Sequence, residues 1–311
     1  MQAIRIENVN KCYSDKVQAL KDITFTVEKG EIFGLVGPDG AGKTTLFNIM
    51  TTLLFPDSGT ITLLEMDVER DYLSVRQIIG YLPGVFSLYP DLTVEENLVF
   101  FATMYKSSLT ENMPVIRPIW KQLLPFKKRR AGKLSGGMKQ KLALCCALIH
   151  KPDILFLDEP TTGVDPVSRK EFWEILKTIQ TTGITVVVST PYMDEATRCD
   201  RIALIQEGEI IKIDTPPAII RDFKGELYSV QTETIFQLLD TMEVSPFVCN
   251  YYPYGEYLHV AFYDENPETI ADEFRRFLDG KEQQYGEIKK IAPSIEDCFI
   301  ELMENKRNVQ H

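Results

Sequence analysis

No apolar run in the sequence approaches the roughly 20 residues that a membrane-spanning helix needs. The N-terminus also lacks a signal-peptide pattern, because Arg5, Glu7 and Lys11 interrupt any apolar stretch. If a membrane is involved, we expect another chain to supply the spans.

The six cysteines show no CxxC spacing and no regular framework, a pattern typical of reduced thiols in the cytoplasm. The net charge is −11 at pH 7, which argues against a broad electrostatic surface for nucleic acid or anionic lipid. Specific nucleic-acid binding is therefore not expected. The length of 311 residues favours two domains over one.

The most informative stretch is residues 37–45, Gly-Pro-Asp-Gly-Ala-Gly-Lys-Thr-Thr. Residues 31–36 before it are typical of a buried strand, and residues 46–50 after it are typical of an opening helix. This strand–GxxxxGK[ST]–helix order is the context of a phosphate-binding loop. The alternative, a glycine-rich turn with a chance lysine, is disfavoured by the flanking elements.

The residue types of this loop fit an anion. Gly37, Gly40 and Gly42 let the backbone curl so that successive N–H groups converge, and the helix N-terminus adds unpaired donors. Lys43 can reach terminal phosphates, and the Thr44 hydroxyl can ligate Mg²⁺. The sequence therefore predicts that the chain binds a nucleoside triphosphate.

Two carboxylates follow a second apolar strand at residues 153–157. Asp158 is placed as a second holder of Mg²⁺, and Glu159 is placed to orient or deprotonate an attacking water. The alternative is a pair of solvated turn acids before Pro160. The phosphate loop favours the catalytic interpretation.

Residues 85–150 are expected to form a helical region inserted between strands of the nucleotide core. Thr93 and Glu96 have the spacing of a capping box. The stretch Leu-Ser-Gly-Gly-Met at 134–138 precedes an apolar helix. Taken alone, Ser135 is a helix N-cap, but such a start also presents N–H donors to an anion.

These motifs, together with Gly-Val-Asp-Pro at 163–166, resemble the nucleotide-binding subunit of an ATP-binding cassette (ABC) transporter. The match runs over residues 1–222 and is most similar to the type-2 exporters, the multidrug and polysaccharide branch. The resemblance implies an α/β P-loop NTPase core with a mixed sheet, an antiparallel N-terminal subdomain and the inserted helical subdomain.

The resemblance also implies residue roles. Tyr13, otherwise a candidate surface tyrosine, would stack on adenine, and Lys43, Thr44 and Asp158 would hold the ATP phosphates and Mg²⁺. Glu159 would act on water. Two cassettes would close head to tail on ATP. The other implied binding residues lie in the loop, in the signature and at the dimer seam: Gly37, Asp39, Gly40, Ala41, Gly42, Thr45, Ser135, Gly136, Gly137 and Asp165.

Two family positions differ here. Gly84 stands where the family has a glutamine, and Pro191 stands where it has a histidine that contacts the γ-phosphate. Proline has no side-chain donor, so turnover at this chain's own site is expected to be slow or lost. A homodimer and a heterodimer with a second, non-identical cassette both remain open.

Residues 225–311 show the order βαββαβ followed by a helix, which predicts a small ferredoxin-like α+β domain. The whole chain is expected to be an ATP-hydrolysing motor subunit, peripheral on the cytoplasmic face of the membrane, with transmembrane permease subunits in separate chains. The alternatives are a soluble ABC-type ATPase that acts on a target such as ribosomes, and a binding-only cassette.

Overall fold

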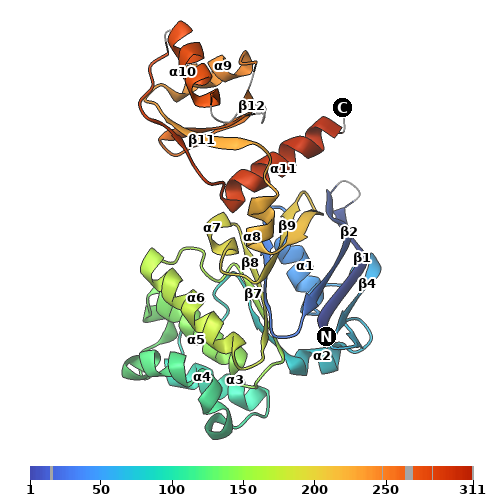
Figure 1. Ribbon diagram of the computed structural model, residues 1–311. Helices are drawn as coiled ribbons and strands as arrows, with labels where there is room; N and C mark the ends of the chain where they lie inside the picture. The colour runs from blue at the N-terminus through green and yellow to red at the C-terminus, as the bar shows by residue number, and fades with distance from the viewer. Residues whose placement is uncertain (15–16, 247, 263–268, 282, 310–311) are drawn as a thin grey trace. The chain divides into compact units, whose positions relative to one another are not determined.

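The computed structural model describes residues 1–14, 17–246, 248–262, 269–281 and 283–309. It contains two compact units, Met1–Pro216 and Pro217–His311 (Figure 1).

The centre of the first unit is a six-stranded sheet of β3 (Ile32–Val36), β6 (Ile79–Leu82), β7 (Ile154–Asp158), β8 (Thr185–Thr190), β9 (Arg201–Gln206) and β10 (Glu209–Asp214). Its order is β10-β9-β3-β8-β7-β6. β10 runs antiparallel to β9 and the other pairs are parallel, so the sheet is mixed, as expected. Every residue of β3, β7 and β8 is buried, which is typical of parallel strands covered on both faces.

A second, antiparallel sheet consists of β1 (Gln2–Ser14), β2 (Val17–Glu28), β4 (Ser58–Leu63) and β5 (Met66–Asp67). Side chains of β1 alternate between the buried and the exposed face of this sheet, since Ile4 and Ile6 are buried and Arg5 is exposed. The sequence pattern places Tyr13 between two strands, but β1 includes it because pairing with β2 continues to the chain reversal.

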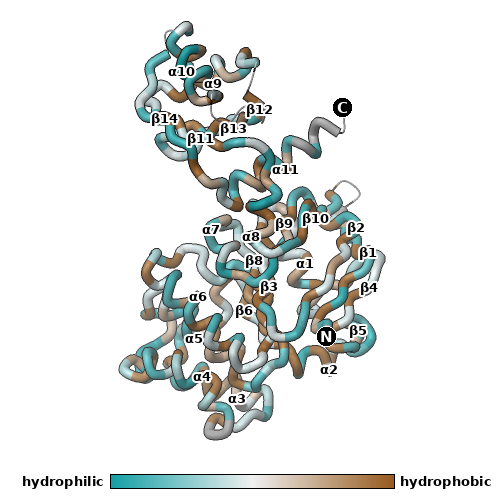
Figure 2. The backbone as a smooth tube through the Cα atoms, in the orientation of Figure 1, coloured by the Kyte–Doolittle hydropathy of each residue, from teal (hydrophilic) through white to brown (hydrophobic). Residues whose placement is uncertain are grey.

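Helix α1 (Lys43–Met50) lies between the two sheets (Figure 1). Phe47 of α1 contacts Phe156 of β7 edge to face, with ring centroids 5.9 Å apart. Phe25 of β2 stacks on Phe33 of β3 at 5.2 Å. Each buried phenylalanine contributes about 1.5–3 kcal/mol, so these apolar contacts, visible as brown tube in Figure 2, stabilise the packing of α1 between the sheets.

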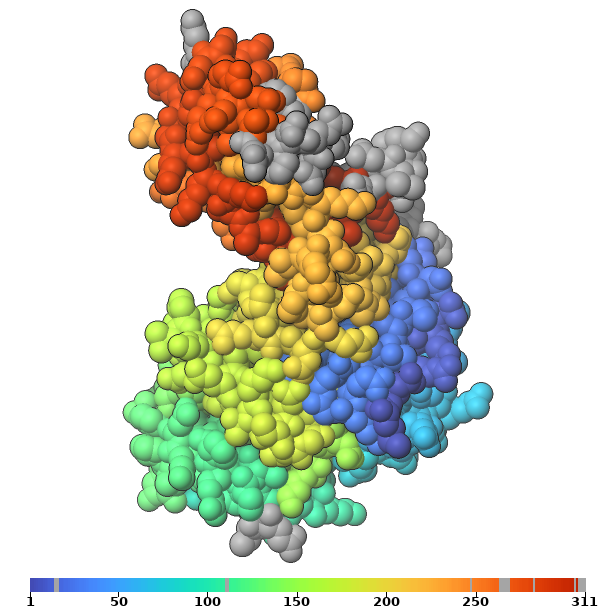
Figure 3. All heavy atoms as spheres, in the orientation of Figure 1, coloured from blue at the N-terminus to red at the C-terminus, as the bar shows by residue number. Residues whose placement is uncertain are grey.

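The helical part of the first unit contains α3 (Val94–Met104), α4 (Leu109–Leu123), η1 (Leu124–Phe126), η2 (Ala131–Lys133) and α5 (Gly136–Leu148). The predicted capping box is present: the Thr93 hydroxyl accepts from the Glu96 N–H at 3.1 Å, and the Glu96 carboxylate accepts from the Thr93 N–H at 2.8 Å. The residues of this helical part lie together in one region of the surface, which is green in Figure 3. The remaining helices are α2 (Tyr72–Ile78), α6 (Pro166–Gln180), α7 (Met193–Ala196) and α8 (Pro216–Arg221).

The second unit contains β11 (Glu226–Gln231), α9 (Ile235–Glu243), β12 (Val248–Tyr254), β13 (Tyr257–Phe262), α10 (Ile270–Gly280), β14 (Ile288–Lys290) and α11 (Ile295–Val309). Its antiparallel sheet has the order β12-β13-β11-β14, the strand order of a ferredoxin-like fold. Leu238 of α9 and Phe274 of α10 pack on one face of the sheet, beside Val260.

Candidate functional site

The phosphate loop joins the end of β3 to the start of α1, and its backbone path requires glycine. Gly42 has φ +103°, and a Cβ there would lie 2.5 Å from the Ala19 carbonyl oxygen. A Cβ on Gly37 would lie 2.1 Å from the Ile205 carbonyl oxygen. Since real Cβ atoms do not approach backbone so closely, larger residues at these positions would open the loop.

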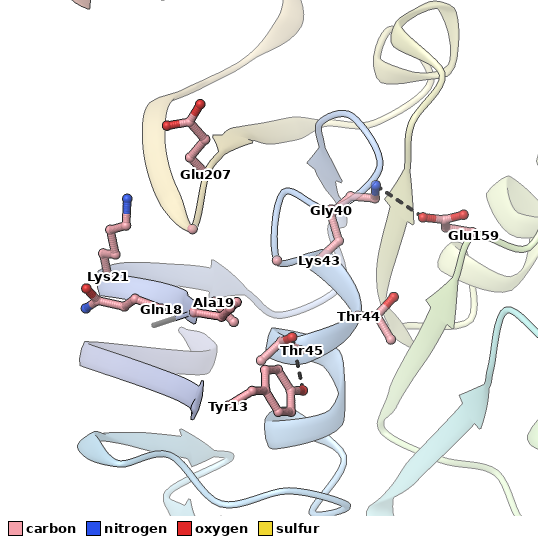
Figure 4. Close-up of a pocket in the computed structure, with 13 residues that line it drawn as sticks. Tyr13, Gln18, Ala19, Lys21, Gly40, Lys43, Thr44, Thr45, Glu159 and Glu207 are labelled. Carbon is pink, nitrogen blue, oxygen red and sulfur yellow. Dashed lines mark hydrogen bonds and ion pairs between the residues drawn. The ribbon is translucent and has the colours of Figure 1, made fainter. Parts of the chain in front are cut away.

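Lys43 is the buried cation of this loop, with 3% of its side chain exposed. Its Nζ donates hydrogen bonds to the carbonyl oxygens of Gly37 (2.9 Å) and Pro38 (3.0 Å). It also lies 3.1 Å from Oε1 of Glu159 (Figure 4). The predicted phosphate-binding lysine and the predicted catalytic carboxylate are therefore neighbours.

Asp158 lies at the carboxyl end of β7, where it is buried. Burial raises the pKa of its carboxyl group, while hydrogen bonds from the Ser189 and Thr44 side chains lower that pKa in part. The Ser189 hydroxyl donates to Oδ1 of Asp158 at 2.5 Å. Thr44 and Asp158, predicted together as Mg²⁺ ligands, thus lie side by side.

Glu159 has φ +47°, a left-handed conformation that is uncommon for a residue with a side chain. Its N–H donates to the carbonyl oxygen (3.1 Å) and to the hydroxyl oxygen (3.0 Å) of Ser189 on β8. This turn directs the carboxylate toward Lys43 rather than along the strand (Figure 4).

A cavity of about 630 Å³ opens beside the loop. This volume is within the range of small-molecule sites. The Tyr13 hydroxyl lies 3.2 Å from Oγ1 of Thr45, and 57% of Tyr13 is exposed. The lining residues come from the loop, from β1, β2 and β7–α6, and from the β9–β10 turn: Tyr13, Val17, Gln18, Ala19, Lys21, Gly40, Gly42, Lys43, Thr44, Thr45, Glu159, Glu207 and Gly208 (Figure 4).

Three polar lining residues were not predicted from the sequence: Gln18, Lys21 and Glu207. The turn that carries Glu207 approaches β2, because the Lys21 N–H donates to the Gly208 carbonyl oxygen at 2.7 Å. No spacing or motif marks these positions. Glu207-Gly208 signals only a turn.

Among the described residues, several predicted site residues do not line this cavity. Within the loop, Gly37 and Ala41 are buried, and Asp39 is exposed. The signature and Asp165 lie at the starts of α5 and α6. A Cβ on Gly137 would come within 2.8 Å of the Ser168 side chain, and the Asp165 carboxylate accepts from the Ser168 N–H at 3.0 Å.

Gly84 and Pro191, the two positions that differ from the family pattern, also lie outside the cavity lining of the described chain. A Cβ on Gly84 would lie 3.2 Å from the Asp158 carbonyl oxygen, so a larger residue there would have to shift the backbone slightly. Pro191 follows β8 directly. Neither position therefore adds a donor to the phosphate end of the cavity.

The mixed sheet, the glycine loop on α1 and the strand-end acids define the chain as a P-loop nucleotide-binding protein. A family model described as ABC transporter matches residues 20–162. The chain is 34% identical to a Nod factor export ATP-binding protein I of Rhizobium etli, over 97% of this chain and 93% of that protein. It therefore belongs to the ATP-binding proteins of the ABC transporter family.

Other relatives extend this comparison. The chain is 44% identical to the probable multidrug ABC transporter ATP-binding protein YbhF of Escherichia coli, over 68% of this chain, but it spans only 37% of the length of YbhF. A dimeric post-hydrolysis structure of the ATP-binding cassette MJ0796 with ADP and Pi has a TM-score of 0.61 and 28% identity, and covers 68% of this chain and 98% of that one. Structures of such cassettes thus share the fold of this chain.

Proposed function

We propose that the chain is the ATP-hydrolysing motor subunit of a membrane exporter. The observation that carries the proposal is the convergence of Lys43, Asp158 and Glu159 beside the glycine loop. The names of the relatives support export, since they are multidrug and Nod factor export proteins. They favour a transporter over a soluble cassette that acts on ribosomes.

Mg²⁺ fits the donor set of this site. The Thr44 hydroxyl and the Asp158 carboxylate supply neighbouring oxygen atoms, the ligand type that Mg²⁺ prefers. When bound with ATP, the ion would neutralise phosphate charge. The raised pKa of Asp158 in the ligand-free chain is consistent with a carboxylate that awaits a cation.

The side chains of this chain suggest a sequence of roles. A terminal phosphate would replace Glu159 as the anionic partner of Lys43, and the loop N–H groups would hold its oxygens. Glu159, released from the lysine, would accept a proton from the attacking water. Tyr13 would cover the base at the other end of the cavity.

Head-to-tail pairing explains why the signature is outside this cavity. Ser135, Gly136 and Gly137 begin α5, whose free N–H groups suit a phosphate that another chain holds. Asp165 would lie at the seam. Because the signature is complete and the chain's own site lacks the glutamine and the histidine, pairing with a non-identical cassette is as well supported as a homodimer.

Among the described residues no helix is long and apolar enough to cross a membrane. The names of the relatives, which are ATP-binding proteins of transporters, support separate permease chains and a peripheral position on the inner face. Co-purification with a polytopic membrane protein supports this proposal, whereas co-sedimentation with ribosomes instead contradicts it.

Steady-state ATP hydrolysis by the purified chain, beside Glu159→Gln and Pro191→His, tests the catalytic proposal. Hydrolysis that Glu159→Gln lowers by about 10²–10³-fold indicates a competent site that works without the histidine. Near-zero hydrolysis that Pro191→His raises indicates a degenerate site and a partner cassette. Absence of ATP binding by the chain would contradict the proposed function.

A further inference from the structure

Arg169, on the first turn of α6, contacts the segment that follows Pro191. Its guanidinium lies 2.6 Å from Oδ2 of Asp194 and 3.6 Å from Oε1 of Glu195. The same group lies 5.1 Å from the centroid of the Tyr192 ring. One arginine therefore holds three side chains of residues 192–195, by two ion pairs and a cation–π contact.

Glu195 continues this set of contacts toward the phosphate loop. It is a buried carboxylate, 2% exposed, whose Oε2 accepts a hydrogen bond from the Thr190 hydroxyl at 2.7 Å. The Thr190 carbonyl oxygen in turn accepts from the N–H of Gly37 at 3.2 Å. Among the described residues Oε1 makes no hydrogen bond, so Arg169 is its charged neighbour.

The segment around Pro191 is held in one conformation. The Thr190 hydroxyl accepts from the Tyr192 N–H at 3.1 Å, which bridges across the proline. Proline also fixes its own φ. A movement of Thr190 would therefore carry Glu195 with it, because a buried carboxylate that loses either partner becomes costly.

Helix α6, which carries Arg169, packs against α5 beside the signature. The Arg169 N–H donates to the Asp165 carbonyl oxygen at 2.9 Å, and its neighbour Ser168 abuts Gly137 of the signature turn. Lys141 of α5 pairs with Glu171 of α6 at 2.6 Å, which holds the two helices together. Arg169 thus belongs to the helix that Asp165 begins, and that helix is paired with α5, which begins at the signature.

We propose that Arg169 is a positioning residue that couples the phosphate loop of this chain to its own signature turn, through Glu195 and Thr190. The inference rests on the proposed head-to-tail dimer, in which the loop and the signature of one chain serve different ATP molecules. Nucleotide at this chain's own site would then adjust the signature that the chain offers to its partner's site.

Hydrogen–deuterium exchange of the purified full chain, with and without Mg²⁺ and ADP, measures this coupling without a partner cassette. In the wild-type chain, ADP is expected to protect residues 37–45 and to slow exchange at 135–140 and 165–170 by about fivefold. Arg169→Gln and the isosteric Glu195→Gln should keep the loop protection and lose the distant one. Arg198→Gln, an exposed arginine of the same segment, should keep both.

Two further variants separate coupling from a merely structural role. Arg169→Lys should restore part of the distant protection, because the charge remains. The double variant Arg169→Gln/Glu195→Gln should lose no more than either single variant, as expected for one shared pathway.

Distant protection that persists in Arg169→Gln, or that is absent from a wild-type chain with a protected loop, overturns the inference alone. If neither ADP nor ATP protects the loop of the wild-type chain, the proposed function fails first and the inference fails with it.

Discussion

At the residue scale, the predicted phosphate-binding lysine and the predicted catalytic carboxylate form an ion pair. Lys43 has two backbone acceptors and one carboxylate, so its buried charge is fully paired. Glu159 is held against it and is therefore not free to act as a base. Arrival of a phosphate would exchange one anion for another at Lys43, which links substrate binding to release of Glu159.

Lys43→Ala removes the cation from this set and leaves two carbonyl oxygens and Glu159 without their partner. We expect the affinity for a fluorescent ATP analogue to fall by roughly 100-fold or more, the effect of breaking a buried charge pair. Fluorescence titration measures it. Lys29→Ala, at an exposed lysine outside the cavity, is the control and should bind as the wild type does. Equal affinity in the two variants contradicts the assigned role.

Asp158→Asn should affect the stability of the protein and its binding of Mg²⁺ and ATP in different ways. Burial raises the pKa of Asp158, so the folded chain binds a proton there more tightly than the unfolded chain does, and stability falls as the pH rises past the unfolded pKa. At neutral pH the neutral amide is expected to raise Tm by a few degrees at most. The same variant should lose the increase in Tm that Mg²⁺ and ATP give the wild type. A lower Tm without ligand would contradict the pKa argument.

At the element scale, the start of α3 shows a local signal that can be recognised in the sequence. The capping box pairs the N–H groups of Thr93 and Glu96 locally, while those of Val94 and Glu95 donate to the carbonyl oxygens of Arg129 and Lys127. Thr93→Ala is therefore expected to lower the free energy of unfolding by about 1 kcal/mol, measured by urea denaturation. Thr178→Ala, at an exposed position in the last turn of α6, should cost nothing or stabilise, because alanine is the better helix former. If Thr178→Ala lowers the free energy of unfolding more than Thr93→Ala does, the cap does not stabilise α3 as proposed.

Helix α11 is held on the sheet of the second unit by one buried carboxylate. Oδ1 of Asp297 accepts from Nδ1 of His259 at 2.7 Å and from the Tyr252 hydroxyl, and Oδ2 accepts from the Ser294 N–H at 2.6 Å. Burial by itself raises the pKa of Asp297, but hydrogen bonds from His259, Ser294 and Tyr252 outweigh it and bring the pKa to about 2.

The lowered pKa of Asp297 predicts a pH dependence of stability. Its contribution is complete above the unfolded pKa near 4 and is lost as the pH falls through about 2. Relative to wild type, Asp297→Asn should cost on the order of 2 kcal/mol at pH 6 and little near pH 2. Urea unfolding at several pH values measures this difference, with the exposed Asp240→Asn as control. A pH-independent difference would rule out the carboxylate as its cause.

At the scale of the whole molecule, the nucleotide cavity is built by one unit. Every residue that lines it belongs to Met1–Pro216. A chain of residues 1–222 is therefore expected to bind ATP with an affinity within about twofold of the full chain, since it keeps every described residue that lines the cavity. Loss of binding in a truncated chain that remains folded by circular dichroism would contradict this independence. A change confined to dimerisation or transport would assign those roles to residues 225–311.

Much of the site could be predicted because its signals are local. The glycine loop, the strand-end acids Asp158 and Glu159 and the Thr93 cap each depend on backbone conformation within a few residues. The element order of the second unit follows from periodicity in the same way. The position of Tyr13 within β1 could not be predicted, because the sequence pattern does not show how far β1 continues to pair with β2.

The sequence by itself thus determined the P-loop class, the family and the residue types that we propose contact a phosphate. Only the tertiary structure decided that Lys43 pairs with Glu159, that Gln18, Lys21 and Glu207 share the cavity, and that the signature lies outside it. It also brought Arg169 to Glu195. These contacts join residues far apart in the chain, and their partners are chosen by the packing of strands and helices, which no local spacing encodes.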